Sequence, residues 1–257
     1  MTQDLPAGAS VPLHIAIALL NTGTLEVLGR MPWSSNMTFL VRISPAEDID
    51  SQKMDSQPES APQVHGVYKP IKGERPLWDF PSGLHRRETA AYRLSHWLNW
   101  DLVPPTVLRD GPFGEGSVQL FVASNYQEHY FTMCENPAYQ DWFQRLCAYD
   151  IVINSTDRKA GHILLGNNLK LYAIDNGLSF HDEFKLRTVI WDWAGQTLPA
   201  NLAQDISKLI TQGPPSEVVE LLTAAECEAL LHRAEVLLAS GYFPSDPSGH
   251  RHPWPLV

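Results

Sequence analysis

The sequence predicts an α+β fold of two unlike lobes, a small antiparallel sheet followed by a mostly helical half. Most runs with the character of strands lie in the first half of the 257 residues, whereas helical spacing dominates after residue 137. A hydrophobic content of 44 % is ample for a core. We therefore expect an N-terminal lobe over residues 1–125 and a C-terminal lobe over residues 126–257, with a cleft between them as the usual place for a ligand.

The overall charge argues against nucleic acid or an anionic membrane as the main partner. The chain carries 29 acidic and 19 basic residues, a net charge of −10, whereas both of those partners reward a basic surface. Its three cysteines show no paired metal spacing and suit reduced thiols in a cytoplasm. The longest early apolar run, IAIALL at 15–20, is far too short to span a bilayer. We expect a cytoplasmic protein without stable membrane anchoring.

The first sixty residues predict two strands of the sheet. Residues 13–22 fit either a short helix or an apolar strand. The runs GTLEVLGR (23–30) and MTFLVRI (37–43) are typical of strands, and the turn MPWSSN (31–36) joins them. Residues 44–63 are acidic and rich in proline and serine, which predicts a mobile loop.

A third strand, a long helix and a hairpin complete the first half. Residues 64–71 predict the strand, which carries Lys69 near its end. Residues 84–100 show the spacing of a helix that ends before Pro104. The turn GPFGEG at 111–116 then joins two further strands.

The second half contains more helix. Residues 137–154 predict a helix that leads into the polar stretch NSTDRKAGH. Two short strands surround the turn at Asn167 and Asn168. Further helices are expected at 199–211 and 216–240, before an extended tail rich in proline and glycine.

Five polar side chains have the types and positions that phosphoryl transfer requires. Lys69 lies on a strand and Glu88 on the helix that follows, and a carboxylate that holds a strand lysine directs its amine toward phosphates. Asp157 and His162 frame the loop DRKAGH, and Asp175 follows a strand in the turn DNG. A catalytic carboxylate and two neighbouring metal ligands suit this reaction, because positioning and charge neutralisation supply most of its rate.

The two polar loops resemble those of a known superfamily. The stretches NSTDRKAGHILL and LYAIDNGLSF are similar to the catalytic and metal-binding loops of the phosphatidylinositol 3/4-kinase-like superfamily, whose pattern is Asp-Arg-x-x-x-Asn and then a strand ending in Asp-x-Gly. The second stretch looks especially like the type II phosphatidylinositol 4-kinases. Over roughly residues 20–200 the chain resembles a small bacterial branch of the superfamily. The resemblance implies a two-lobed, protein-kinase-like fold.

The resemblance also implies a role for each candidate. Asp157 would orient or deprotonate the acceptor hydroxyl, and Asp175 would hold the metal that bridges the ATP phosphates. Lys69 would contact the α- or β-phosphate, with Glu88 as its partner. The resemblance further assigns a phosphate-covering turn and an adenine-binding segment, which correspond to Ser34, Ser35 and Asn36, and to Phe121, Val122 and Ala123.

Two positions depart from the family pattern. His162 stands where the family has asparagine, so a softer imidazole nitrogen replaces a hard amide oxygen. Either the metal preference moves from magnesium toward manganese or zinc, or one metal site is lost and transfer is slow or absent. Lys159 stands where many relatives carry histidine, and it adds a positive charge near the transferring phosphate.

The candidates also have ordinary structural interpretations. A lone aspartate in a turn is usually a helix cap or part of an Asx-turn, and residues 34–36 alone fit a hairpin turn. Glu88 has arginines beside it and fits a salt-bridged helix face. His162 suits a buried, hydrogen-bonded role without a metal. Arg158 is expected to pair with Asp150 rather than to bind substrate.

We therefore expect an ATP-dependent phosphotransferase of this type that works with a divalent metal, magnesium or manganese. The acidic balance favours a hydroxyl on a protein or a soluble small molecule over a membrane lipid as the acceptor. Two alternatives stay open: a nucleotide-binding pseudokinase, which His162 motivates, and a nucleotidyl transferase.

Overall fold

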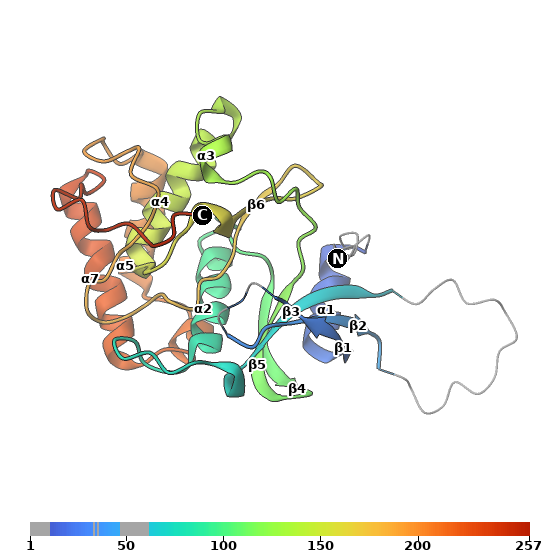
Figure 1. The fold of residues 1–257 in the computed structure, drawn as a ribbon. Coiled ribbons are helices and arrows are strands. Elements are labelled where there is room, and N and C mark those ends of the chain that lie inside the picture. The colour runs from blue at the N-terminus through green and yellow to red at the C-terminus, as the bar shows by residue number, and fades with distance from the viewer. Residues whose placement is uncertain (1–10, 33, 35, 47–61) are drawn as a thin grey trace, which may run out of the picture.

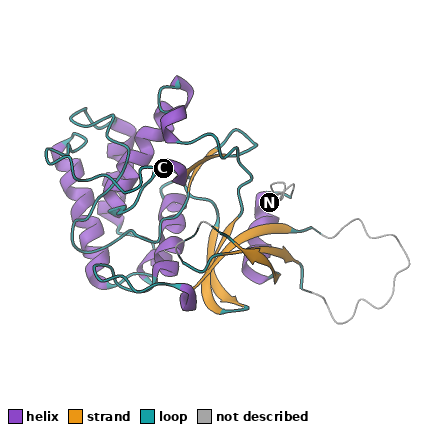
Figure 2. Cartoon of the chain, in the orientation of Figure 1, coloured by secondary structure: helices purple, strands orange, loops and turns teal. Residues whose placement is uncertain are grey.

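The structure is a computed structural model that describes residues 11–32, 34, 36–46 and 62–257. A five-stranded antiparallel sheet occupies its N-terminal part and helices dominate its C-terminal part (Figure 1 and Figure 2). The predicted α+β, two-lobed fold is therefore confirmed. The candidate Ser35 and most of the predicted loop at 44–63 lie outside the described residues.

The central strand of the sheet, β3, carries Lys69. The strand order is β1-β2-β3-β5-β4. Val64 and Tyr68 on β3 are buried on one face. Lys69 points to the other face, because neighbouring residues of a strand face opposite sides, and it pairs in register with Ser117 on β5. The strands are β1 (Thr24–Arg30), β2 (Phe39–Ser44), β3 (Val64–Pro70), β4 (Thr106–Gly111) and β5 (Gly114–Leu120).

A short helix, α1 (Leu13–Thr22), packs against the sheet (Figure 1). Its contacts with Tyr68 place it on the face opposite Lys69. The segment that fitted a helix or a strand is therefore a helix. Leu19 and Leu20 of α1 pack with Val41 and Tyr68 in a small core. The opposite face of the sheet, which carries Lys69, is not part of this core.

The N-terminus of α2 (Leu84–Trp97) is capped by a carboxylate from outside the helix. Glu74 accepts hydrogen bonds from the amides of Gly83 (2.9 Å) and His85 (3.0 Å). These bonds satisfy N–H groups that have no partner within the helix, and they place a negative charge at the positive end of the helix dipole. The His85 ring lies 2.8 Å from the same carboxylate and 3.0 Å from Glu115 on β5. The start of α2 is thereby fixed to the sheet.

Three helices form the frame of the helical lobe: α4 (Gln140–Ile153), α5 (Ala200–Gln212) and α7 (Ala224–Ser240). Leu146, Ile206 and Leu230 from these helices share one core with the inner side of α2. No helix in the described ranges combines the length and apolar character needed to cross a membrane. The smaller elements are α3 (Tyr130–Met133), α6 (Ser216–Val219), β6 (Ile163–Leu165), β7 (Leu171–Ala173), and the 3₁₀ turns η1 (Ile71–Gly73), η2 (Pro137–Tyr139) and η3 (Ala160–His162).

The prediction of one continuous helix at 216–240 is wrong. The first part ends at Val219 and α7 begins at Ala224. A capping box starts the second helix: the Thr223 side chain accepts from the amide of Glu226, and the Glu226 side chain accepts from the amide of Thr223. The sequence TAAE is the Ser/Thr-x-x-Glu signature of a helix start, so the break has a signal in the sequence.

The segment after β5 is hydrogen-bonded to both lobes. The amide of Phe121 donates to the carbonyl of His65 on β3 (2.9 Å). The carbonyl of Ala123 accepts from Asn167, in the turn between β6 and β7 (3.0 Å). The predicted lobe boundary between residues 125 and 126 lies just beyond this segment and stays a prediction.

We predict that His85 makes the stability of the protein fall at alkaline pH. Burial alone would lower the pKa of His85, but Glu74 and Glu115 outweigh it and raise that pKa above its usual value. The charged ring then contributes stability that is complete below the unfolded-state pKa of about 6.5 and is lost as pH rises through the folded-state pKa. Urea unfolding from about pH 6 to about pH 9 should show this loss, and His85→Gln should flatten it.

The exposed His96 provides the matched control for His85→Gln, because its Nδ1 lies 2.9 Å from Oδ1 of Asp101 in an exposed pair. His96→Gln should keep the pH profile of the native protein, because exposed ion pairs contribute little. A His85→Gln profile as steep as that of the native protein would contradict the assignment.

Candidate active site

Lys69 lies between two carboxylates from different parts of the chain. Its amine contacts the Glu88 carboxylate of α2 and is 2.8 Å from Oδ1 of Asp175. Burial alone would lower the pKa of Lys69, but Asp175 and Glu88 outweigh it and raise the pKa above its ordinary value. The amine is therefore charged at physiological pH, and it joins the sheet to the turn after β7.

Glu88 also holds the turn that carries Asp175. Its Oε2 accepts a hydrogen bond from the amide of Asn176 at 3.0 Å. A Cβ at Gly177 would lie 3.2 Å from Cβ of Leu84 and 3.4 Å from Glu88 Oε1. The glycine of the Asp-Asn-Gly turn thus allows the turn to approach α2 closely.

Asp175 carries a charged carboxylate that is partly open to solvent. Its backbone is left-handed, with a φ of 58°, and its side chain is 53 % exposed. The charge of Lys69 is the main cause that lowers the pKa of Asp175, and His162 adds to it against the effect of burial. The carboxylate is ionised throughout the physiological range, as a ligand for a cation must be.

The predicted pair of Arg158 and Asp150 is present and completely buried. Nε of Arg158 lies 3.1 Å from Oδ1 of Asp150, and Nη2 lies 3.0 Å from the same atom. The guanidinium also donates to the carbonyl of Ile174 (2.7 Å) and to Oδ1 of Asn176 (2.5 Å). One side chain therefore joins α4, the loop that carries Asp157 and the turn that carries Asp175.

Asp157 directly precedes Arg158 in the sequence, and its carboxylate lies next to Lys159. Oδ2 of Asp157 is 3.2 Å from Nζ of Lys159, and both side chains are partly exposed. Burial raises the pKa of Asp157, and Lys159 opposes that rise only in part. A carboxylate with a raised pKa is a stronger base than an ordinary aspartate.

His162 faces Asp175 and is neutral near pH 7. Its Nδ1 accepts from the amide of Lys159 at 3.4 Å, and its Nε2 lies 3.4 Å from Oδ2 of Asp175. Burial outweighs the charge of Asp175 and lowers the pKa of His162 to about 4. Since Nδ1 accepts, the single proton of the neutral ring resides on Nε2 and points to Asp175.

Two hydrogen bonds hold the predicted phosphate-covering turn in place. Ser34 Oγ lies 2.6 Å from Oγ1 of Thr38, and Asn36 Oδ1 accepts from the amide of Arg75 at 3.0 Å. The turn is thus fastened to the loop before α2. Its role toward phosphate stays a prediction.

The predicted adenine segment lines a cavity of about 520 Å³. Phe121, Val122 and Ala123 form one wall, and other walls come from α1, the end of α2 and the turn between β6 and β7. Neither Lys69 nor Asp175 lines this cavity. It therefore lies apart from the polar cluster, and the adenine role of the segment stays a prediction.

The donor set suits a cation that is shared with phosphates. Within the described ranges there is no cluster of three or more His, Cys, Asp and Glu side chains that could hold a metal ion by itself. Magnesium is usually bound by one or two carboxylates together with substrate phosphates and waters. Asp175 fits that pattern, whereas His162 in this arrangement offers an N–H group rather than a lone pair.

Asn176 lies in the candidate site but was not among the predicted site residues. It is buried, and it connects Glu88 to Arg158 through its amide and its side-chain oxygen. One indication of this role was present in the sequence, the position of Asn176 between Asp175 and Gly177 in the Asp-Asn-Gly turn. The bond to Glu88 spans 88 residues and has no signature in the sequence.

The antiparallel sheet lobe, the helical lobe and the Lys69–Glu88–Asp175 cluster between them define a protein of the kinase-like class. The model of the phosphatidylinositol 3- and 4-kinase family matches residues 84–238, from the start of α2 into α7. The chain belongs to this family. The match includes Glu88, Asp157 and Asp175 but begins after Lys69.

Two known proteins are similar to this chain. Protein Rv2133c of Mycobacterium tuberculosis is 37 % identical over 276 residues, which cover 93 % of this chain and 94 % of that protein. The crystal structure of CtkA, a proinflammatory kinase of Helicobacter pylori, has a TM-score of 0.51 over 86 % of this chain and 93 % of that one. At 9 % identity the second likeness concerns the fold alone. A bacterial branch of the family, as predicted, is confirmed.

We predict that Asp150→Asn costs about 3–5 kcal/mol of unfolding free energy, because it leaves the buried Arg158 charge without its counterion. Urea denaturation measures the loss. Glu26→Gln removes the partner of Arg42 in an exposed ion pair and should cost less than about 1 kcal/mol. Equal effects of the two substitutions would show that Arg158 is not the buried hub.

Proposed function

We propose that the protein is an ATP-dependent phosphotransferase that transfers the γ-phosphoryl group to a hydroxyl of a protein or a soluble small molecule. The observation that carries the proposal is the placement of Lys69, Glu88 and Asp175 in one cluster, with Asp157 on the adjoining loop. Each comes from a different element of the two lobes. Family membership and the kinase-like fold support the same reaction class.

The charges of the cluster suit nucleotide phosphates. Lys69, held by Glu88, would bind the α- or β-phosphate, because its amine is charged and its position is fixed on both sides. Lys159 would face the transferring group and offset its negative charge. A magnesium or manganese ion held at Asp175 would neutralise charge on the phosphate oxygens.

Asp157 would act on the acceptor. Burial raises the pKa of its carboxyl, so the carboxylate would orient the hydroxyl and take up its proton as the oxygen bonds to phosphorus. ADP leaves when the bond between the β-bridging oxygen and the γ-phosphorus breaks. Arg158 contributes by position, since its guanidinium is fully engaged within the protein.

The choice of acceptor class rests on charge. With a net charge of −10, the chain lacks the basic character that anionic lipid surfaces attract. A hydroxyl on a protein or a soluble metabolite fits this surface better. The family contains kinases for different acceptors, and a fold does not determine the acceptor by itself.

A pseudokinase is the second candidate, and His162 is the observation that favours it. The histidine occupies the asparagine position of the family pattern, and its Nδ1 is engaged with the Lys159 amide. One ligand of a second cation would then be missing. Such a protein would bind nucleotide and transfer phosphate slowly or not at all.

We predict that Lys69→Met weakens the binding of ATP by about 10- to 100-fold, because it removes charge-assisted hydrogen bonds to phosphate. Isothermal titration calorimetry with ATP and magnesium measures the change. Lys72→Met, at an exposed lysine on the neighbouring 3₁₀ turn, is the control and should bind as the native protein does. Native affinity in Lys69→Met would remove Lys69 from the site.

We predict that Asp157→Asn keeps the affinity for ATP and loses turnover. The substitution keeps the shape of the side chain and removes only the group that acts on the acceptor. ATP binding by calorimetry and ADP release by a coupled assay separate the two effects. Normal turnover in Asp157→Asn would show that the loop is assigned wrongly.

We predict that the native protein shows no preference for manganese over magnesium, because Nε2 of His162 carries a proton that faces Asp175. His162→Asn supplies a hard oxygen ligand and should strengthen ATP binding in magnesium. Calorimetric titration of both proteins with each metal tests this. A strong manganese preference that disappears in His162→Asn would make His162 a metal ligand instead.

A further inference from the structure

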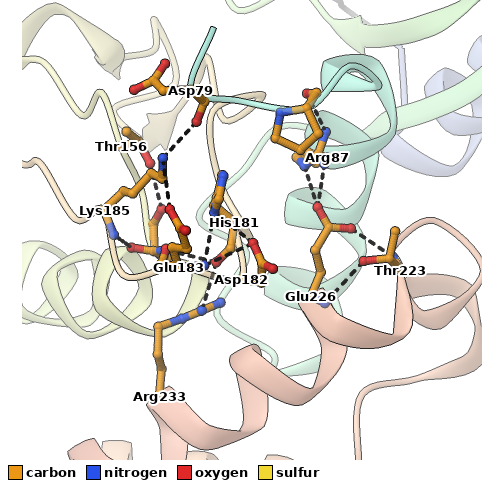
Figure 3. Close-up of polar contacts among 12 residues, drawn as sticks. Asp79, Arg87, Thr156, His181, Asp182, Glu183, Lys185, Thr223, Glu226 and Arg233 are labelled. Atoms are coloured by element: carbon orange, nitrogen blue, oxygen red, sulfur yellow. Dashed lines mark hydrogen bonds and ion pairs between the residues drawn. The ribbon is translucent and has the colours of Figure 1, made fainter. Parts of the chain in front are cut away.

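A buried ion pair joins the helix that carries Glu88 to the helical lobe. Arg87 precedes Glu88 on α2, and its Nε lies 2.9 Å from Oε1 of Glu226 on α7 (Figure 3). Both side chains are 6 % exposed, and 139 positions separate them in the sequence. A charge in such a place is costly unless it is paired, so α2 and α7 are held together at this point.

Glu226 is itself fixed by the start of α7. Its Oε2 accepts from the amide of Thr223 at 2.8 Å in the capping box described above. One carboxylate thus caps α7 with one oxygen and binds α2 with the other, and Figure 3 shows Thr223, Glu226 and Arg87 in succession. The anchor point for Arg87 is therefore set by the helix itself.

Arg87 also organises the loop that leads into α2. Its Nη1 donates to the carbonyl of Ser82 at 3.0 Å, and its guanidinium carbon lies 5.2 Å from the centre of the Phe80 ring. Phe80 in turn packs edge-on against His181 at 5.1 Å. The loop before α2 and the segment that follows Asp175 are therefore gathered on the same side of α2.

Arg87 and Glu88 are neighbours on α2, but they bind different parts of the molecule. Arg87 binds Glu226 in the helical lobe, while Glu88 binds the amine of Lys69 and the amide of Asn176. A movement of α2 away from α7 would shift both side chains. Both sets of contacts are thus made by adjacent residues of the same turn of α2.

We propose, on the basis of the nucleotide-binding function proposed above, that the Arg87–Glu226 ion pair is the tether that positions Glu88, and through it the amine of Lys69. Arg87 and Glu226 are positioning residues that do not touch the nucleotide. The Lys69–Glu88 contact is then present in the isolated chain, without a modification or a partner that moves α2. Loss of the tether lowers the affinity for nucleotide at a distance.

The double variant Arg87→Met/Glu226→Gln tests the tether without leaving a buried charge unpaired. Glutamine still accepts the amide of Thr223, so the cap of α7 is kept. We expect the Kd for a non-hydrolysable ATP analogue with magnesium to rise about tenfold, measured by calorimetry at a temperature where circular dichroism shows both proteins folded.

Thr223→Ala is the matched control. It removes the hydroxyl that accepts from the Glu226 amide and leaves the ion pair with Arg87 in place. Its Kd for the analogue should equal that of the native chain. A Kd raised as much as in the double variant would assign the effect to the start of α7 and overturn the tether.

A thermodynamic cycle with Lys69→Met separates positioning from general destabilisation. If the tether acts through Lys69, the double substitution weakens binding in the native chain and has no further effect once Lys69 is methionine. An unchanged Kd in the double variant, or an equal weakening in both backgrounds, overturns the inference and leaves the proposed function standing. Native affinity in Lys69→Met overturns both, so the two failures are distinguishable.

Discussion

The arrangement of the site depends on the buried guanidinium of Arg158. It binds Asp150 of α4, the carbonyl of Ile174 and the side chain of Asn176, all within 3.2 Å. A buried charge is tolerated only when its partners are in place together. The loop with Asp157 and the turn with Asp175 are therefore held in place by the same side chain.

The second constraint is the position of Lys69 between carboxylates from two lobes. Its strand belongs to the sheet, Glu88 belongs to α2, and Asp175 belongs to the helical lobe. The Lys69–Glu88–Asp175 cluster consequently forms only when the sheet, α2 and the turn after β7 lie in place together. Glu74 and Glu226 bind α2 at His85 and Arg87, within three residues of Glu88.

Local patterns predicted most of the fold, because strand alternation, helix spacing and turn residues act over short distances. They placed Lys69 on a strand, Glu88 on a helix and Asp175 in a turn, and their grouping followed from the family pattern. Contacts between distant positions carried no local signal: Glu226 meets Arg87 across 139 positions and Asn176 meets Glu88 across 88. The TAAE cap is an intermediate case, because its signature is local but the prediction of a helix at 216–240 did not use it.

The central claim is that this site transfers the terminal phosphoryl group of ATP. The most direct measurement follows label from ATP carrying it in the γ- or the α-phosphate, with magnesium, into a pool of soluble proteins and metabolites and into the chain itself. Transfer of γ-label alone, dependent on Asp157, is the result expected. Transfer of α-label would identify a nucleotidyl transferase, and tight binding of ATP without transfer of either label would contradict the kinase assignment in favour of a pseudokinase.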